Sequence, residues 1–487
     1  MCLGWLVVLV FFSQGTTAPT ASQLDSDGAA LLAQGKLSEA EAQFRRALAI
    51  DPRDAESLNN LGVILRRRGR PDEAVAFLRR AVEVQPNDAL LHSNLALALR
   101  EAGRLNEALA ELGIASRLAP RDAAIHRNLG ILLAQAGNDL QAESEFTKSL
   151  DLDPRSPQTH QELGRLLALE KRTDQAEKEY LAALSIADQS FLHFELGELY
   201  QNNRRFGLAA HEFRSAVHLD PKNAQYFQAL GHVLLAEDKL GEAETELLRA
   251  IQLNPSAGEP HRDLGEVFQR KGEFDRALVE LRRAAELMPT DSRSHYMLAR
   301  VLGKLGKQDE AAGEMRLAQK LTQAEKSRPL SKALNNQGTK LLEEGKVEEA
   351  IEKFQQALQL NPGDNRAQYN LAVAYVVENH FDRAAEQFRA YLRSVPDDPD
   401  ASYYLGLALL GSGRPTEAAG SLAKAVGLRP DDAPAHNAFG VALAKAKEFD
   451  RAAQQFEAAR HLQPEKLKYA KNLACLEHRL EGCTLAP

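Results

Sequence analysis

The sequence predicts an all-α solenoid of helix-turn-helix units stacked along one axis. The first observation is a small residue, glycine or alanine, that returns in steps of mostly 34 residues from Gly28 to Gly440. The second is an alanine at another fixed place in every unit, from Ala40 to Ala452, and the third is a proline near most unit ends. A fixed period of this length indicates an array of one supersecondary unit rather than a globular enzyme domain.

Thirteen units of 34 residues follow if the recurrent glycine is given unit position 8. They begin at residues 21, 55, 89, 123, 157, 190, 224, 258, 292, 331, 365, 399 and 433. Alanine then stands at unit position 20 in all thirteen, and proline at unit position 32 in eleven. The phase shifts twice: one residue is lost near Asp188–Gln189, and five are gained at 326–330.

Each unit is predicted to form two helices. In the second unit an apolar series from Leu58 to Leu65 leads to Gly69, and a second series begins at Ala74. A glycine at unit position 15 suits the left-handed residue that ends a helix, and the proline at unit position 32 ends the second helix. Small residues at unit positions 8, 20 and 27 allow the paired helices to approach closely, and larger ones would overpack the contact by about 1–3 kcal/mol.

The seventh unit places Phe227, Leu230, Gly231, Leu234, Ala243, Leu247, Ala250 and Pro255 at the positions of the tetratricopeptide repeat (TPR) pattern. Over about residues 21–466 the chain therefore resembles a TPR protein, although the tryptophan common in that pattern is replaced mostly by His or Leu. The resemblance implies a right-handed superhelix whose first helices line a concave groove. It also implies a non-enzymatic protein that binds other proteins or peptides.

Both ends and one internal seam depart from the repeat. Residues 3–12 form a short apolar run followed by small and polar residues, so residues 1–21 are predicted to be a signal peptide that is cleaved within Gly15–Ala21. The run lacks a preceding Lys or Arg, which leaves a misassigned start or an uncleaved anchor as alternatives. We expect an exported protein, periplasmic or secreted, with no membrane span in the mature chain.

The remaining segments are a block of nine repeats at 22–325, an insertion at 326–330, four repeats at 331–466 and a capping helix with a tail at 467–487. The insertion either lengthens the second helix of the ninth unit, or loosens the junction, or forms a longer loop that leaves the stacking unbroken. Export would permit a disulfide between Cys475 and Cys483, the alternative being two unlinked thiols.

Candidate binding residues lie on the first helix of each unit, where in TPR proteins unit positions 2, 5, 6, 9, 12 and 13 face the groove. Asparagine recurs at unit position 6 as Asn60, Asn94, Asn128, Asn336 and Asn370, and Asn472 follows on the capping helix. A side-chain amide donates and accepts, so such a ladder can hold a peptide backbone without reading its sequence. The alternative is that asparagine is only a common polar residue of the consensus.

A second candidate is an aromatic surface with neighbouring arginines. Tyr296, Met297, Arg300, Tyr369, Tyr403 and Tyr404 stand at groove positions of the ninth, eleventh and twelfth units, as do Arg293, Arg366, Val373 and Leu407. Exposed contiguous tyrosines beside arginine are typical of a binding hot spot. The alternative is aromatic packing between neighbouring first helices.

Seven histidines also recur, at unit position 4: His92, His126, His160, His193, His261, His295 and His436. Neighbouring repeats are offset by about 10 Å, whereas zinc ligands lie about 2.0–2.3 Å from one ion, so we interpret this series as packing and expect no metal and no cofactor. Catalytic motifs are absent, and the net charge of −8 is spread without a basic stripe for nucleic acid.

These observations predict a protein-binding scaffold that is not an enzyme and that holds a segment of a protein partner in its concave groove. The alternative is a structural, self-associating spacer in a cell-envelope or secretion assembly. A third hypothesis, ligand or metal binding through the histidine series, is tested by metal analysis.

Overall fold

The computed structural model describes residues 19–477 and 485–486 of the chain. Within them 26 α-helices follow one another and no strand occurs, which confirms the predicted all-α repeat solenoid. The chain divides into two compact units, unit 1 (Met1–Leu287) and unit 2 (Met288–Pro487). The 34-residue units of the sequence are called repeats from here on, and a unit position is a place within one repeat. The ninth repeat clusters with the repeats that follow it. The predicted signal segment lies outside the described residues up to residue 18.

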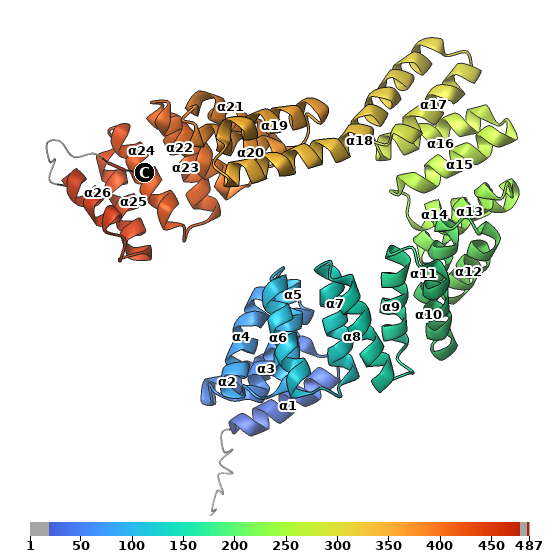
Figure 1. The fold of residues 1–487 in the computed structure, drawn as a ribbon, viewed down its shortest axis with the longest axis horizontal. Coiled ribbons are helices and arrows are strands. Elements are labelled where there is room, and N and C mark those ends of the chain that lie inside the picture. Colours follow the sequence, from blue (N-terminus) through green and yellow to red (C-terminus); the bar gives the residue numbers. More distant parts are fainter. Residues whose placement is uncertain (1–18, 478–484, 487) are drawn as a thin grey trace, which may run out of the picture. The chain divides into compact units, whose positions relative to one another are not determined.

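Unit 1 contains eight helical hairpins that stand side by side (Figure 1). Their first helices are α1 (Ala21–Ala33), α3 (Ala55–Arg67), α5 (Ala89–Glu101), α7 (Ala123–Gln135), α9 (Pro157–Leu169), α11 (Ser190–Asn202), α13 (Ala224–Ala236) and α15 (Gly258–Lys271). Their second helices are α2 (Leu37–Ile50), α4 (Pro71–Val84), α6 (Leu105–Leu118), α8 (Asp139–Leu152), α10 (Thr173–Ile186), α12 (Phe206–Leu219), α14 (Leu240–Leu253) and α16 (Phe274–Leu287).

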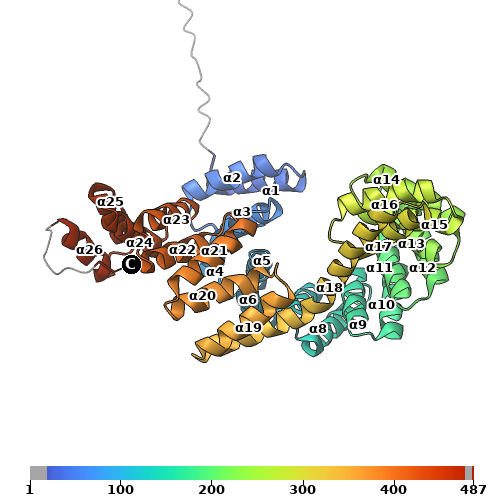
Figure 2. The ribbon, with the colours of Figure 1, turned by 90° about the horizontal axis from the view of Figure 1, so that it is seen from above.

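Unit 2 continues the pattern and ends on a single helix. Its helices are α17 (Ser292–Lys304), α18 (Gln308–Glu343), α19 (Val347–Leu360), α20 (Asn365–Val377), α21 (Phe381–Ser394), α22 (Pro399–Gly411), α23 (Pro415–Leu428), α24 (Ala433–Lys445), α25 (Phe449–Leu462) and α26 (Leu467–Glu477). Figure 2 shows α20, α22, α24 and α26 in this order. Leu473 and Tyr469 of α26 are buried, so this helix covers the last repeat as a cap.

The turn inside each repeat has one backbone requirement, a left-handed residue at unit position 15. All thirteen residues at this position have positive φ, and eight of them are glycine. The other five are Lys171, Arg204, Asp238, Asn379 and Lys447. The repeat therefore imposes the conformation even where glycine does not favour it.

The paired helices meet where a large side chain at unit position 24 lies over the small residue at unit position 8. A Cβ added to Gly62 would stand 2.4 Å from Cγ of Leu78, and one added to Gly130 would stand 2.7 Å from the Phe146 ring. The same holds for Gly406, whose added Cβ would stand 2.4 Å from Cγ of Leu422. Real Cβ atoms do not approach this closely, so the close contact excludes a side chain at these glycines.

The five-residue insertion is helical. α18 runs for 36 residues without a turn, from the second helix of the ninth repeat through Pro329 to the first helix of the tenth. It packs against α17 in its first half and α19 in its second. Of the alternatives open from the sequence, the lengthened helix is therefore the observed one. Ser331, just beyond the insertion, is buried and its hydroxyl donates to the Ala357 carbonyl at 3.0 Å.

The histidine series forms struts between helices and between repeats. In His92, His126, His160 and His295, Nδ1 lies 2.6 Å from a glutamate oxygen on the following helix. Nε2 of each lies 2.9–3.2 Å from the proline carbonyl of the preceding repeat. Both partners only accept hydrogen bonds, and a neutral imidazole carries a single N–H. Only the protonated ring makes both bonds at once.

The one-residue deletion alters one strut. It shortens the loop between α10 and α11, where aspartate replaces the usual proline. His193 then places Nε2 2.9 Å from Oδ1 of Asp188 and Nδ1 2.6 Å from Oε2 of Glu212.

The contact at unit position 8 predicts opposite effects for two identical substitutions in one repeat. Gly406→Ala adds a methyl group against Leu422 and should lower the free energy of unfolding by about 1–3 kcal/mol. Gly420→Ala, on α23 with no atom within 4 Å of the new Cβ, should raise it by about 0.5–1 kcal/mol. Urea denaturation measures both, and equal effects would contradict the contact.

The His160 strut predicts greater stability at mildly acidic pH. The hydrogen bond to Glu179, together with the Pro154 carbonyl, raises the pKa of His160 above its ordinary value. The stabilisation is therefore fully present below the ordinary histidine pKa of about 6.5 and is lost as pH rises through the higher folded value. We expect the urea midpoint to fall between pH 6 and pH 8, less so in His160→Gln.

His218→Gln serves as the control, because His218 is exposed on α12 and makes no hydrogen bond or ion pair with another described residue. Its pH dependence should match that of the unaltered chain. A midpoint that rises with pH, or His160→Gln behaving as this control does, would contradict the role of the His160 strut.

Candidate functional site

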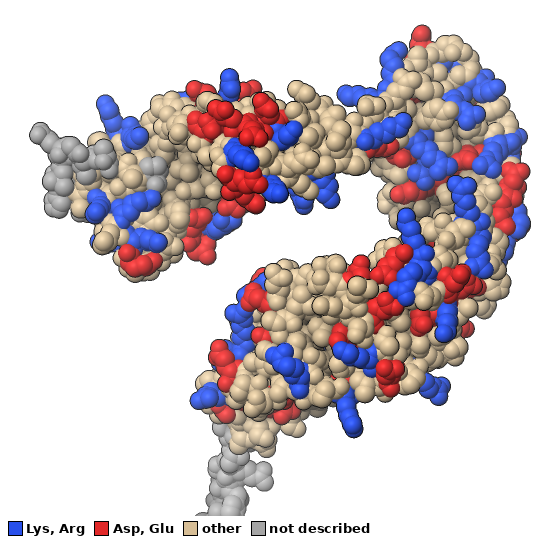
Figure 3. Space-filling model, viewed as in Figure 1, with Lys and Arg blue, Asp and Glu red and all other residues tan. Residues whose placement is uncertain are grey.

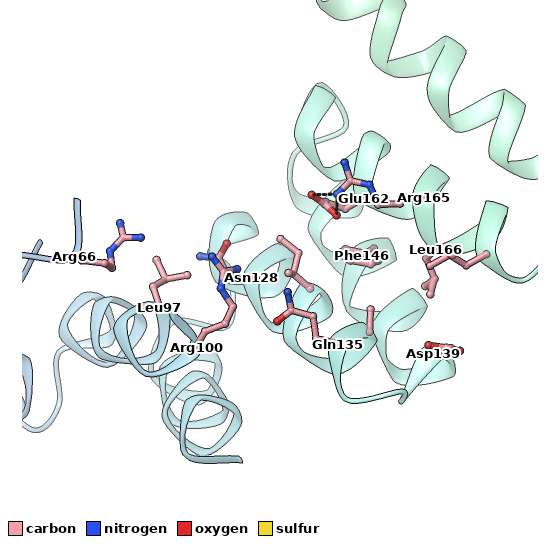
Figure 4. A pocket seen from close by; sticks show the side chains of 13 residues that line it. Arg66, Leu97, Arg100, Asn128, Gln135, Asp139, Phe146, Glu162, Arg165 and Leu166 are labelled. Carbon is pink, nitrogen blue, oxygen red and sulfur yellow. Dashed lines mark hydrogen bonds and ion pairs between the residues drawn. The ribbon is translucent and has the colours of Figure 1, made fainter. Parts of the chain in front are cut away.

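The first helices of unit 1 line a hollowed face. A cavity of about 790 Å³ opens along it, with lining residues from α3, α5, α7, α8 and α9. Leu97, Ile131 and Leu166 give it apolar walls, while Asn128 and several charged side chains stand at its edge. Figure 4 shows Arg66, Arg100 and Asn128 on one side of this cavity and Glu162 with Arg165 on the other. In each compact unit we call the surface formed by unit positions 2, 5, 6, 9, 12 and 13 of the first helices the first-helix face.

Charges on this face are arranged in pairs. Arg66 binds Glu101 of the next repeat at 2.7 Å, and Arg165 pairs with both Glu162 and Glu195. Burial raises the pKa of Glu162, which favours its neutral form near the cavity wall. Sequence reasoning missed Arg100, Glu162 and Arg165, although they stand at groove positions 12, 6 and 9 of their units. The signal that identifies them is a charged residue at a groove position.

Three members of the predicted asparagine ladder, Asn94, Asn370 and Asn472, pair with an asparagine of the preceding repeat. Asn94 donates from Nδ2 to Oδ1 of Asn59 at 2.8 Å, and Asn370 donates to Oδ1 of Asn335 at 3.0 Å. A third pair, Asn472 and Asn437, has the same geometry at 2.8 Å. The donor stands at unit position 6 and the acceptor at position 5 of the preceding repeat, 35 residues earlier.

The other members of the ladder are not in such pairs. Asn60 and Asn336 stand on α3 and α18 as predicted, and Asn128 lines the cavity of unit 1. Their side chains make no hydrogen bond with another described residue. The acceptors Asn59, Asn335 and Asn437 were not predicted, and the signal that finds them is an asparagine 35 residues before another.

The predicted tyrosines of α20 and α22 form one aromatic cluster together with two rings of α21. The rings of Tyr369 and Tyr404 lie 6.4 Å apart, and those of Tyr403 and Tyr404 lie 5.3 Å apart. Phe388 lies 5.7 Å from Tyr369 and stacks on Tyr404 at 6.0 Å. The tyrosines are partly exposed over this core phenylalanine, so the surface combines packing with accessible aromatic area.

Tyr391 completes the cluster and was missed from the sequence. It stands at unit position 27, which is alanine or serine in the twelve other repeats. Its ring lies 5.4 Å from Tyr369, and its hydroxyl donates to Asp398 at 2.7 Å. Burial, followed by this hydrogen bond, raises the pKa of Tyr391 to about 12, and burial raises that of Tyr403 to about 12. These phenols remain neutral hydrogen-bond donors.

The predicted residues of the ninth repeat lie apart from this cluster. Tyr296 is 46% exposed and lines a separate cavity between α17 and α18, while the guanidinium of Arg300 lies 5.9 Å from its ring centre. Met297 is only 5% exposed and belongs to the repeat core, so we leave it out of the binding surface. The aromatic patch of the sequence thus becomes two surfaces on unit 2.

Comparison with family models identifies the repeat. Two tetratricopeptide repeat models match residues 28–89, 93–157, 194–258, 262–326 and 407–466, and residues 341–406. The chain belongs to the tetratricopeptide repeat family. This result confirms the resemblance and the fold class, and it supports a scaffold that binds proteins. None of the curated proteins matches the sequence.

Several solved TPR structures are similar to this TPR chain. YrrB, described as a TPR protein with an unusual peptide-binding site, is 20% identical over 38% of this chain and 95% of its own, with a TM-score of 0.35. The Cut9–Hcn1 hetero-tetramer of the APC/C is 15% identical over 94% and 96%, with a TM-score of 0.38. A TPR protein from Parabacteroides merdae is 20% identical over 51% and 98%, with a TM-score of 0.42.

Four further predictions concern features outside the first-helix face of this TPR chain. Within residues 19–477 and 485–486, no three His, Cys, Asp or Glu side chains come together as metal ligands. Over the same residues no helix has the length and apolar character to cross a membrane.

Cys475 is buried and disulfide-bonded. Cys483, its predicted partner, lies outside the described residues, and their pairing stays a prediction. Acidic and basic side chains are interspersed over the visible surface of each unit (Figure 3).

The aromatic cluster predicts different costs for its exposed and buried rings. Phe388→Ala should lower the free energy of unfolding by about 3–5 kcal/mol, since the ring is fully buried. Tyr391→Ala restores the residue common at this TPR position and should cost about 1–2 kcal/mol through lost ring contacts. Denaturation measures both, and an equal cost would place Tyr391 in the core rather than on the surface.

Proposed function

We propose that the protein is a non-enzymatic scaffold that holds an extended segment of another protein along its first-helix face. The observation that carries the proposal is the repeated asparagine pair. In Asn59–Asn94 and Asn335–Asn370 the shared hydrogen bond uses Oδ1 of the earlier residue and Nδ2 of the later one. Each pair keeps one donor, Nδ2 of the earlier asparagine, and one acceptor, Oδ1 of the later.

One donor beside one acceptor matches the C=O and N–H groups of a peptide backbone. An extended segment on the first-helix face of either unit therefore finds the same donor and acceptor, at Asn59–Asn94 in unit 1 or at Asn335–Asn370 in unit 2. Because backbone groups are the same in every residue, these contacts supply affinity without selecting a sequence. The family membership of the chain agrees with this use of the repeats.

Selectivity would come from the side chains between the asparagine pairs. In unit 2 the cluster of Tyr369, Tyr391, Tyr403 and Tyr404 offers partly exposed rings. Burial raises the pKa of Tyr403 to about 12, so its hydroxyl is a neutral donor, while the Tyr391 hydroxyl already donates to Asp398. Tyrosine combines apolar area with a hydrogen-bonding tip and is enriched in binding hot spots. The cluster therefore favours a segment that carries an apolar or aromatic side chain.

We further propose that the scaffold acts outside the cytoplasm, because residues 3–12 and the small residues after them have the pattern of a signal peptide. Trp5 is the single tryptophan of the chain, so cleavage removes all tryptophan fluorescence. Protein purified from the extracytoplasmic fraction should show none, and detecting it would contradict cleavage.

Selection of extended peptides on the full chain tests the function. Binders from a displayed peptide library are measured by fluorescence anisotropy against the chain and against Asn370→Ala. Loss of one backbone hydrogen bond should weaken binding by about two- to tenfold. Replacing a peptide N–H by N-methyl at the corresponding residue should weaken binding of the chain similarly and leave that of Asn370→Ala unchanged.

The controls separate the asparagine pair and the tyrosines from the remaining surface. Asn106→Ala, an exposed asparagine on α6, should bind as the unaltered chain does. Tyr369/Tyr403/Tyr404→Ala should change which peptides are selected. Binding that ignores all of these variants would place the site elsewhere, and a mass that grows with concentration in the absence of peptide binding would favour the self-associating spacer.

A further inference from the structure

The last asparagine pair already holds a stretch of peptide backbone, and that stretch belongs to the chain itself. Nδ2 of Asn437 and Nδ2 of Asn472 donate to the carbonyl oxygen of Ala486 at 2.9 and 2.8 Å. The backbone N–H of Ala486 donates to Oδ1 of Asn472 at 3.3 Å. Residue 486 therefore uses the donor and the acceptor that the other two pairs leave open.

The place of this pair in the array makes the contact informative. Asn437 lies on α24 and Asn472 on α26, the two first-helix positions that end the array, and these helices are in contact (Figure 2). The pair repeats the 35-residue spacing and the shared hydrogen bond of Asn59–Asn94 and Asn335–Asn370. The segment at Ala486 thus lies on the same row of the first-helix face as the ligand proposed above.

Two further features show that the segment is seated rather than merely nearby. With the tail in place Asn437 is 0% exposed and Asn472 is 3% exposed, whereas Asn59, Asn94 and Asn370 are only partly buried and Asn335 is 6% exposed. Once the tail covers these amides, leaving them without partners would cost about 1–3 kcal/mol, so the hydrogen bonds to Ala486 are what allow the tail to lie there. Leu485 is half-buried and packs against the hydrophobic core of unit 2, which adds an apolar anchor beside the backbone contact.

We propose that Leu485–Ala486 is an intramolecular ligand that occupies the last position of the first-helix face and competes there with outside protein segments. The inference rests on the proposed function, because the competitor is a segment bound in the same way. The site makes hydrogen bonds to both backbone groups of one residue, and beside them an apolar surface receives the aliphatic side chain of the residue before it. A competing segment needs a leucine-like residue immediately before the residue whose backbone is held, while the side chain of the held residue is exposed, as that of Ala486 is.

Tethering decides how strong the competition is. A linked segment acts at an effective concentration on the order of 1 mM, so even a weak contact keeps the site filled. An outside segment then binds with an affinity reduced by the fraction of chains whose seat is empty. Removing the tail restores that fraction without changing any residue of the seat.

Hydrogen exchange on the full chain tests whether the tail is seated. Mass spectrometry of the fragment that contains residue 486 should show one amide exchanging at least about tenfold more slowly than in Leu485→Asp. Leu467→Asp places the same charge at an exposed leucine of α26 and should keep the slow amide. No slow amide in the unaltered chain, or its survival in Leu485→Asp, would overturn the proposal.

Competition is read with a fluorescein-labelled peptide, Gly-Ser-Gly-Ser-Thr-Leu-Ala-Pro, by anisotropy. A chain that ends at residue 484 should bind this probe at least about tenfold more tightly than the full chain. Asn472→Ala in the shortened chain should abolish the gain, while circular dichroism verifies that all variants are folded. Equal affinity for both chains, or no binding to the shortened chain, would overturn the proposal.

The two measurements also separate this proposal from the function it rests on. The exchange measurement reports the tail contact whether or not any outside segment binds. A seated tail with no library peptide bound at the other pairs would contradict the scaffold function alone. Library binding at Asn370 with an unseated tail would contradict only the competition.

Discussion

The close approach of two helices within each repeat is the constraint on which the structure depends. A ring or leucine at unit position 24 occupies the space that a side chain at unit position 8 would need, as Phe146 does over Gly130. This contact sets the spacing inside the hairpins that carry glycine at unit position 8, and alanine keeps it close in the other three. The spacing in turn decides which side chains of neighbouring first helices reach one another. The asparagine bridges depend on this geometry, since a shift of 1 Å would break a 2.8 Å hydrogen bond.

The repeat length, the helix starts and the left-handed turn were readable from the sequence because each is imposed by local chemistry and repeated thirteen times. The continuous α18 was left open, since the insertion Lys-Ser-Arg-Pro-Leu contains a proline, which disfavours a helix interior but does not forbid it. Among the site residues, position 6 of the asparagine ladder was predicted and its partners at position 5 were not. Their pairing needs the spacing between repeats, which no single repeat encodes.

The aromatic residues also show what could not be predicted from the sequence. Groove positions were assigned from the family pattern to first helices only, so Met297 was included although its side chain turns into the core, and Tyr391 was omitted because it stands on a second helix, α21. A departure from the consensus is therefore more informative than the consensus. Tyr391 differs from all other residues at its position, and it completes the cluster beside Tyr369.

The uninterrupted α18 gives the chain a way to change orientation without changing a repeat. Each residue of an α-helix advances the chain by about 1.5 Å and turns it by about 100°. Because residues 326–330 are part of one helix, adding or removing a single residue there would rotate the repeats after α18 about its axis by roughly that angle. The number of residues inserted at this seam thus determines the rotation of the later repeats about the α18 axis relative to the ninth repeat, in steps of about 100°. The packing contacts within the hairpins do not have to change.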